Sequence, residues 1–429
     1  MRLSRGIAAI VLPAVAAMTV TCTTQKSNFT ITGDIAGLQI GDTVKLCTLD
    51  LPSWNESTAF TIVVDDTSGF SCKGYLEHDQ YFILRYKTNE GKEIVADRNG
   101  KTFIVRPGDD ITFTGRRENI YYSRISGGIY DEPQLAGYLK ADDSLGLVRG
   151  SYMRNLEEAR AAGDTAEMYR WADEFNAFYN NNPGVDRVNA LKRAYIDSNT
   201  QGTLFLLVER LPGIGYEPID KVRKIYDNYS EEIKESWYGK KTAEFITRME
   251  AIAPGRPAPD FELVTIDGDT ITKETYAGKY LLFYHWGLCP GSIYIDSYVC
   301  GLYDKYHRKG LEVVGLTESI ATIRDLYGQT LDSAHDSELN ATLGNMLKHK
   351  WTEVELETEY PENKNISDTY MISGWPFFIL IGPDGTLLAR NFSEAFYESQ
   401  EILEKELGNP AHPKEPSPTP TALRRMAKT

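Results

Sequence analysis

The hydrophobic pattern of this 429-residue chain changes its period twice, and these changes limit the folds that it can adopt. Across residues 29–126, short runs alternate apolar and polar side chains between Gly and Asp, which predicts antiparallel strands. Across residues 131–253, apolar side chains recur at helical spacing among many charges. From residue 254 to 407, strand and helix patterns alternate, which predicts an α/β sheet. We therefore expect a multidomain protein.

The predicted domains follow from these changes. They are a signal peptide at 1–21, an all-β sandwich or barrel at 28–128, an α-helical connector at 129–253, a C-terminal α/β domain at 254–408 and a disordered tail at 409–429. The tail contains five prolines and no apolar period.

The first 22 residues predict export from the cytoplasm. Arg2 and Arg5 precede an uncharged apolar run at 6–20, which is shorter than the ~20 residues of a spanning helix. Cys22 follows in a context that resembles the lipobox of bacterial lipoproteins, in which the cysteine carries the lipid anchor. Cleavage after residues 14–16 is the alternative, and it would leave a soluble periplasmic protein. Both hypotheses place the chain in the cell envelope, on the periplasmic side of a membrane, where disulfides persist.

Composition excludes several functions. Lys plus Arg number 46 and Asp plus Glu 61, and the net charge of −15 gives no overall field that attracts nucleic acid. The chain has no Gly-rich phosphate loop and no Gly-x-Ser-x-Gly motif, so nucleotide hydrolysis and serine esterase chemistry have no support. Its six histidines show no metal-ligand spacing with one another or with the five cysteines. We therefore expect no structural metal, no cofactor and no nucleic-acid partner.

Cys289 is the strongest candidate for a reactive group. It stands where the apolar strand at 280–284 ends and a helix at about 291–307 begins. The unpaired N–H groups and positive dipole end of a helix stabilise thiolate over thiol, so a cysteine in this place is expected to be a nucleophile. His285 could polarise the thiol, but a histidine at the end of a buried strand is more often a packing residue.

Three motifs in the C-terminal domain resemble the periplasmic thioredoxin-like thiol-disulfide oxidoreductases of the cytochrome-maturation type. They are Pro-Ala-Pro-Asp-Phe at 257–261, the strand and cysteine element at 283–292, and Ser-Gly-Trp-Pro-Phe-Phe-Ile-Leu-Ile at 373–381, with Asp-Gly at 384–385. The resemblance implies a thioredoxin fold in which Pro376 is a cis-proline that faces Cys289. It further implies that backbone groups beside Pro376 pair with a substrate polypeptide, and that Pro290, Gly291 and Trp375 contribute to the substrate site.

This chain departs from the family at three places. The Trp that normally stands just before the first cysteine is Leu288 here. The second, resolving cysteine is Ser292, so a mixed disulfide formed at Cys289 cannot be resolved by its neighbour. Cys300 cannot replace it, because eleven residues span about 16 Å along one helix, against a limit of about 7 Å for a disulfide. The acid that normally lies six residues beyond the first cysteine is Ile295 here, and Asp296 is expected to point elsewhere on the helix.

Three functions remain open. In the first, Cys289 exchanges disulfides with proteins of the envelope that carry thiols or disulfides, and an external thiol releases the partner. In the second, the domain is a redox-inactive module that binds peptides or partner proteins near Pro376. In the third, it reduces peroxide as peroxiredoxins do, but those proteins place Thr or Ser where this chain has Trp286. We rank exchange first and peroxide reduction last.

The β-rich region resembles an N-terminal β-domain of unknown function that is common on envelope lipoproteins. The segments 29–37, 66–74, 105–109 and 125–128 carry this resemblance, which implies attachment, docking of partners or spacing from the membrane. Cys47 and Cys72 both lie on predicted strands of this region. A disulfide between them and a pair of buried free thiols are equally open alternatives.

Overall fold

The computed structural model describes residues 26–51, 55–67, 69–92, 94, 98, 100–211, 218–325, 337–356 and 360–408. The predicted signal peptide, Cys22 and the predicted proline-rich tail lie outside these residues. Within the described ranges, no helix combines the length and the apolar character that a membrane span requires.

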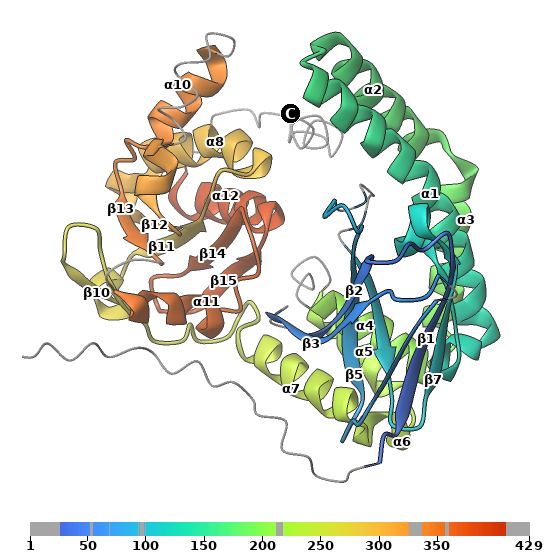
Figure 1. Ribbon diagram of the computed structural model, residues 1–429. Helices are drawn as coiled ribbons and strands as arrows, with labels where there is room; N and C mark the ends of the chain where they lie inside the picture. Colours follow the sequence, from blue (N-terminus) through green and yellow to red (C-terminus); the bar gives the residue numbers. More distant parts are fainter. Residues whose placement is uncertain are drawn as a thin grey trace, which may run out of the picture.

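Two four-stranded sheets form the N-terminal part of the chain (Figure 1). Aromatic rings link them: Phe29 contacts Phe82 of the opposite sheet at 6.2 Å between ring centroids, and Phe103 contacts Phe113 at 4.9 Å. Buried side chains from both sheets therefore fill one core, and the more exposed strand at 55–63 covers its edge with Phe60 and Ile62. The first sheet has the order β4 (Phe70–Gly74), β1 (Phe29–Ala36), β7 (Asp110–Arg116) and β8 (Arg124–Ser126). The second has the order β3 (Asn55–Val63), β2 (Thr43–Asp50), β5 (Gln80–Lys87) and β6 (Lys101–Val105).

The two cysteines of this region belong to different sheets. Cys47 lies on β2 and Cys72 on β4, and both are buried free thiols. The Sγ atom of Cys47 lies 3.6 Å from the hydroxyl of Thr58. Of the two alternatives, the structure has the pair of free thiols and not the disulfide.

The helical region packs against the second sheet. Tyr81 of β5 donates a hydrogen bond from its hydroxyl to the carbonyl of Phe205, and its backbone N–H donates to the hydroxyl of Tyr238 at 3.2 Å. These contacts fix the helices that carry the two partners, α4 and α7, to the sheet. The helices are α1 (Pro133–Ala162), α2 (Thr165–Asn181), α3 (Pro183–Ile196), α4 (Gln201–Arg210), α5 (Ile219–Asp227), α6 (Glu231–Glu235) and α7 (Trp237–Ala251).

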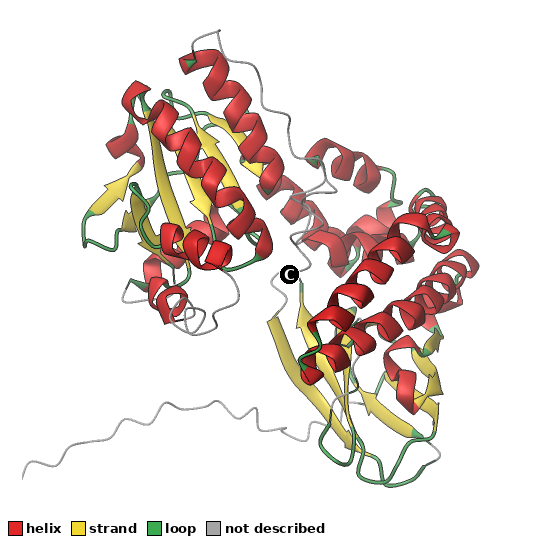
Figure 2. Cartoon of the chain, turned by 90° about the horizontal axis from the view of Figure 1, so that it is seen from above, coloured by secondary structure: helices red, strands yellow, loops and turns green. Residues whose placement is uncertain are grey.

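The C-terminal domain contains a five-stranded sheet with helices packed on it (Figure 2). The strand order is β13 (Thr352–Glu355), β12 (Leu311–Thr317), β11 (Tyr280–His285), β14 (Phe377–Ile381) and β15 (Leu387–Asn391). The pairs that join β11, β12 and β13 are parallel, whereas β14 and β15 are antiparallel to their neighbours. A hairpin of β9 (Glu262–Val264) and β10 (Thr270–Thr272) precedes this sheet.

The central strand β11 is buried on both faces, as its unbroken apolar run requires. Leu282 and Tyr284 pack with α8 (Pro290–Tyr306) and α12 (Ser393–Leu407), whereas Leu281 and Phe283 pack into the cluster on the opposite face. Further helices are α10 (Ser337–Met346) and α11 (Asn365–Thr369), and residues 320–325 are also helical. Short 3₁₀ turns lie at Arg117–Tyr122, Gly128–Asp131, Lys273–Tyr276, His307–Lys309 and Pro361–Lys364.

Candidate functional site

Cys289 is the N-cap residue of α8. Its backbone is extended, with φ −80° and ψ 153°, and Pro290 begins the helix, where the missing N–H of proline costs no hydrogen bond. The Sγ atom of Cys289 accepts a hydrogen bond from the backbone N–H of Ser292 at 3.3 Å, and the residue is partly exposed. A backbone donor and the helix dipole therefore both stabilise negative charge on this sulfur.

Ser292 occupies the place of the resolving cysteine and contacts the sulfur directly. Its Oγ atom lies 3.3 Å from the Sγ atom of Cys289, and it also accepts a hydrogen bond from the backbone N–H of Gly287 at 3.3 Å. The residue is fully buried, so the hydroxyl is held in this position. The hydroxyl of Ser292 is therefore a second polar neighbour of the sulfur. A thiol at the same position would allow an internal disulfide.

A cis-proline loop completes the site. The peptide bond between Trp375 and Pro376 is cis, and the carbonyl oxygen of Trp375 lies 3.6 Å from the Sγ atom of Cys289. A Cβ atom at Gly291 would lie 3.0 Å from Cδ of Pro376, so glycine lets the proline ring approach the start of α8. The structure thus brings Cys289, Gly291, Ser292, Trp375 and Pro376 together, although the loop is far from the helix in sequence.

Three features define the fold of this domain. They are the strand order of its sheet, the cysteine at the start of α8 and the cis-proline that faces this cysteine. The C-terminal domain is thioredoxin-like. Solved structures that align with this chain include thiol-disulfide oxidoreductases and a thiol:disulfide interchange protein, and each of those below covers between a third and two fifths of it.

The thioredoxin domain of a thiol-disulfide oxidoreductase from Bacteroides vulgatus is 22% identical, covers 35% of this chain and 97% of that chain, and gives a TM-score of 0.27. A thiol:disulfide interchange protein from Bacteroides sp. is 21% identical over 38% of this chain and 95% of that chain, with a TM-score of 0.28. A thiol-disulfide oxidoreductase from Bacteroides fragilis is 23% identical over 34% and 99%, with a TM-score of 0.25. No family model and no curated protein matches the chain.

In this thioredoxin-like domain, His285 holds the cis-proline loop. Its Nε2 atom accepts a hydrogen bond from the indole N–H of Trp375 at 3.1 Å, so Nδ1 carries the proton and donates to the carbonyl of Gly374 at 3.0 Å. Burial lowers the pKa of His285 to about 4, which keeps the ring neutral. Both ring nitrogens are engaged by the loop, and this agrees with the packing role and not with polarisation of the thiol.

A buried acid lies below the site, and the sequence interpretation missed its role. Ile295 packs in the core, and Asp296, one residue further along α8, is turned inward as well. The hydroxyl of Tyr284 lies 3.4 Å from Oδ1 of Asp296 and 3.4 Å from the carbonyl oxygen of Ser292. Asp296 is therefore connected through Tyr284 to the first turn of α8. The only signal in the sequence was a charged residue inside an apolar helical stretch.

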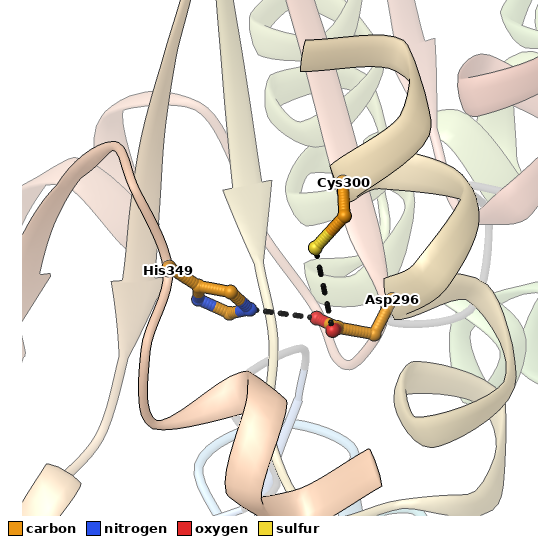
Figure 3. A group of neighbouring side chains, drawn as sticks. All are labelled: Asp296, Cys300 and His349. Carbon is orange, nitrogen blue, oxygen red and sulfur yellow. Dashed lines mark hydrogen bonds and ion pairs between the residues drawn. The ribbon is translucent and has the colours of Figure 1, made fainter. Parts of the chain in front are cut away.

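His349 is the ion-pair partner of this acid. Its Nε2 atom lies 2.9 Å from Oδ1 of Asp296, and its Nδ1 atom lies 2.7 Å from Oε1 of Glu353. Burial alone would lower the pKa of His349, but the hydrogen bonds to the two carboxylates outweigh it and raise the pKa to about 9. The sulfur of Cys300 joins the same cluster, so the structure brings a histidine, a cysteine and an aspartate together (Figure 3). Spacing along the chain did not reveal this group.

A cleft of about 790 Å³ borders the cis-proline loop. The cleft is lined by Phe245 and Met249 of connector helix α7 and by Trp375 of the loop. A hydrogen bond of 2.9 Å from Arg248 of α7 to the carbonyl of Asp368 on α11 ties the connector to the thioredoxin-like domain beside the cleft. Trp375 is 37% exposed, so an apolar surface lies between this cleft and the sulfur of Cys289.

Proposed function

We propose that the protein exchanges thiols and disulfides in the cell envelope, through Cys289 as a single-cysteine Cys-x-x-Ser site. The geometry at Sγ supports this proposal most directly. The sulfur is partly exposed, accepts a backbone N–H at 3.3 Å and lies 3.6 Å from the carbonyl oxygen of the residue that precedes the cis-proline. In this proposal, the nucleophile lies beside the backbone edge that binds the partner polypeptide.

In the first step, the thiolate of Cys289 attacks one sulfur of a substrate disulfide. A new S–S bond joins Cys289 to that sulfur, the substrate S–S bond breaks, and the second substrate sulfur leaves as a thiolate that takes a proton from water. The N–H and hydroxyl of Ser292 stabilise the attacking thiolate, because both lie 3.3 Å from it.

In the second step, a thiol from outside the site resolves the mixed disulfide. Ser292 has no sulfur, and Cys300 lies about 16 Å along the same continuous helix. A thiol of the same substrate attacks instead, forms a new substrate disulfide and releases Cys289 as thiolate. The net reaction rearranges disulfides without oxidation or reduction. If a small thiol attacks the substrate sulfur, it leaves joined to the substrate as a mixed disulfide.

The partner polypeptide lies in the cleft beside Trp375 in this proposal. Backbone groups beside Pro376 pair with it in an extended conformation, and the apolar faces of Phe245, Met249 and Trp375 contact its side chains. Partners are thiol- or disulfide-bearing proteins of the envelope. The chain meets these partners either at the membrane, where a lipid on Cys22 anchors it, or as a soluble periplasmic protein.

One observation favours the second function, a redox-inactive binding module. Ser292 closes the route to an internal disulfide, while the cleft and the exposed Trp375 remain suited to a peptide. For peroxide reduction, the residue that would orient the peroxide is Trp286, whose buried indole N–H donates to Glu353 at 3.0 Å. Position 286 therefore offers no hydroxyl that could orient a peroxide, so peroxide reduction stays last.

Trapping of mixed disulfides separates these functions. The full chain and its Cys289→Ala variant are expressed in a bacterial envelope, thiols are alkylated rapidly, and adducts are resolved on non-reducing gels. Exchange predicts adducts that depend on Cys289 and disappear on reduction. A binding module predicts equal, non-covalent recovery of partners by both variants and no adducts. Consumption of peroxide that depends on Cys289 would instead favour the third function.

A further inference from the structure

The middle of α8 carries a second group of reactive side chains, separate from Cys289. Asp296 and Cys300 are four residues apart, so they lie on one face of the helix, one turn from each other. His349, which follows α10, reaches the same point from the other side (Figure 3). The Nε2 atom of His349 lies 2.9 Å from Oδ1 of Asp296, and Sγ of Cys300 lies 3.8 Å from Oδ2. All three donor atoms lie within 4.8 Å of one another.

The histidine is held by a further carboxylate. Its Nδ1 atom lies 2.7 Å from Oε1 of Glu353, and Glu353 in turn accepts indole N–H groups from Trp351 at 2.8 Å and Trp286 at 3.0 Å. This arrangement leaves Nε2 as the atom that faces Asp296 and Cys300. A carboxylate that fixes the outer nitrogen of a histidine is a usual neighbour of metal-binding histidines.

The cluster also has space beside it. A cavity of about 270 Å³ is lined by Asp296, Cys300 and His349, together with Asp304 and Asn345. The side chains of His349 and Asp296 are only 1% and 2% exposed, so the donors stand at the closed end of this cavity. A ligand that enters it meets sulfur, nitrogen and oxygen at one point, and a water molecule has room at a fourth position.

We propose that Asp296, Cys300 and His349 bind one Zn²⁺ ion. Tetrahedral zinc with bonds of about 2.0–2.3 Å separates its ligand atoms by about 3.2–3.8 Å, and the donor atoms here, which lie within 4.8 Å of one another, reach that spacing by small side-chain shifts. A thiolate ligand excludes Mg²⁺ and Ca²⁺, which prefer oxygen alone. On binding, Cys300 loses its proton to solvent, and zinc replaces the proton between His349 and Asp296. The ion joins α8 to the segment before β13 and does not depend on exchange at Cys289.

Cobalt substitution tests the site in the full chain. The purified, metal-free protein is titrated with Co²⁺, which reports thiolate ligation through a charge-transfer band in the near ultraviolet, and Zn²⁺ is then added in competition. We expect one equivalent of Co²⁺ to give this band and Zn²⁺ to displace it. The Cys300→Ser variant retains a hydrogen-bond donor to Asp296, so it should fold, and it should lose the band. The matched control Cys289→Ser should keep it.

A second variant distinguishes ligation from folding. Glu353→Gln keeps the shape of the side chain, and it should lower the affinity for Zn²⁺ by about 10- to 100-fold while the thiolate band remains. Zn²⁺ should raise the melting temperature of the wild-type protein and leave that of Cys300→Ser unchanged. A wild-type protein without the band, or a band that survives Cys300→Ser and disappears with Cys289→Ser, would overturn the proposal. Neither result would bear on exchange at Cys289.

Discussion

Two regions along α8 each bring a cysteine together with a histidine from another segment. Hydrogen-bond donors lie beside the sulfur in the first region, whereas carboxylates lie beside it in the second. At its first turn, Cys289 accepts a backbone N–H, and the nearby His285 is kept neutral because burial lowers its pKa to about 4. In its middle, burial and the carboxylate of Asp296 raise the pKa of Cys300 to about 12, while hydrogen bonds to two carboxylates raise the pKa of His349 to about 9. The two histidines therefore take different protonation states at neutral pH, neutral at His285 and charged at His349.

The difference shows what makes a thiol reactive in this fold. Both cysteines are partly exposed on one helix, so exposure alone does not separate them. The groups around each sulfur do separate them, because donors favour the thiolate and a carboxylate opposes it. The first region is thus suited to nucleophilic attack, and the second keeps its proton until a cation displaces it.

Alkylation rates should show the largest contrast between the two regions. With metal removed by a chelator, Cys300 at neutral pH should react roughly a thousandfold more slowly than an ordinary thiol, because its pKa is raised to about 12. Its rate should increase with pH, since the thiolate fraction rises towards that value. Peptide mapping after timed treatment with iodoacetamide measures both cysteines in one sample. Equal rates at Cys289 and Cys300 would remove the basis of the comparison.

Removal of each sulfur should affect exchange very differently. Cys289→Ser should lower the rate of disulfide rearrangement in a scrambled test protein by roughly a hundredfold or more, because no nucleophile remains. Cys300→Ser should leave that rate within about twofold, since Cys300 lies about 16 Å away along the helix. The yield of native disulfides, followed by acid quenching, is the measurement. A large loss with Cys300→Ser would contradict the assignment.

The neutral state of His285 predicts a loss of stability in acid. The pKa in the folded protein, about 4, lies below the usual value of about 6.5, so the unfolded chain takes up a proton first as pH falls. This histidine should therefore cost the fold about 2 kcal/mol between pH 7 and pH 5. Urea unfolding of wild type and His285→Asn at several pH values tests it. The variant should lose less stability over that interval, and parallel curves would show that His285 is not kept neutral.

A second sulfur at the first turn should convert the site to a dithiol. In Ser292→Cys the new sulfur would start from the position of an oxygen that lies 3.3 Å from Sγ of Cys289, and small shifts would allow an S–S bond of about 2.05 Å. The variant should form an internal disulfide and shorten the lifetime of mixed disulfides by roughly tenfold. Gel analysis at timed intervals checks this. Adducts as long-lived as those of wild type would show that the two positions cannot react.

Much of the first region could be predicted from the sequence because its parts are local. An apolar strand followed directly by Cys289-Pro290 places the sulfur at the start of a helix, and the motif around Trp375-Pro376 indicates the facing loop. The departure at Ser292 was likewise visible in the chain. Hydrophobic alternation also indicated strands in the N-terminal region, and unbroken apolar runs indicated the buried strands of the C-terminal sheet.

The second region could not be predicted, because it depends on contacts between distant segments. β13 pairs with β12, and β12 lies beside β11. This pairing brings the segment before β13 to α8, where His349 contacts Asp296. Helical period alone placed Asp296 away from the site, since it does not tell which neighbours cover a given face. The cleft is similar, because its α7 wall comes from the packing of the connector.

The most direct test of the account is the site of a covalent adduct on the native protein. The reduced, metal-free full chain is exposed briefly to a small disulfide such as glutathione disulfide, quenched with acid and mapped by mass spectrometry. We predict one adduct, at Cys289, that a free thiol releases, with Cys300 unmodified. An adduct at Cys300 in preference to Cys289, or none at either sulfur, would contradict the claim that the start of α8 activates its thiol.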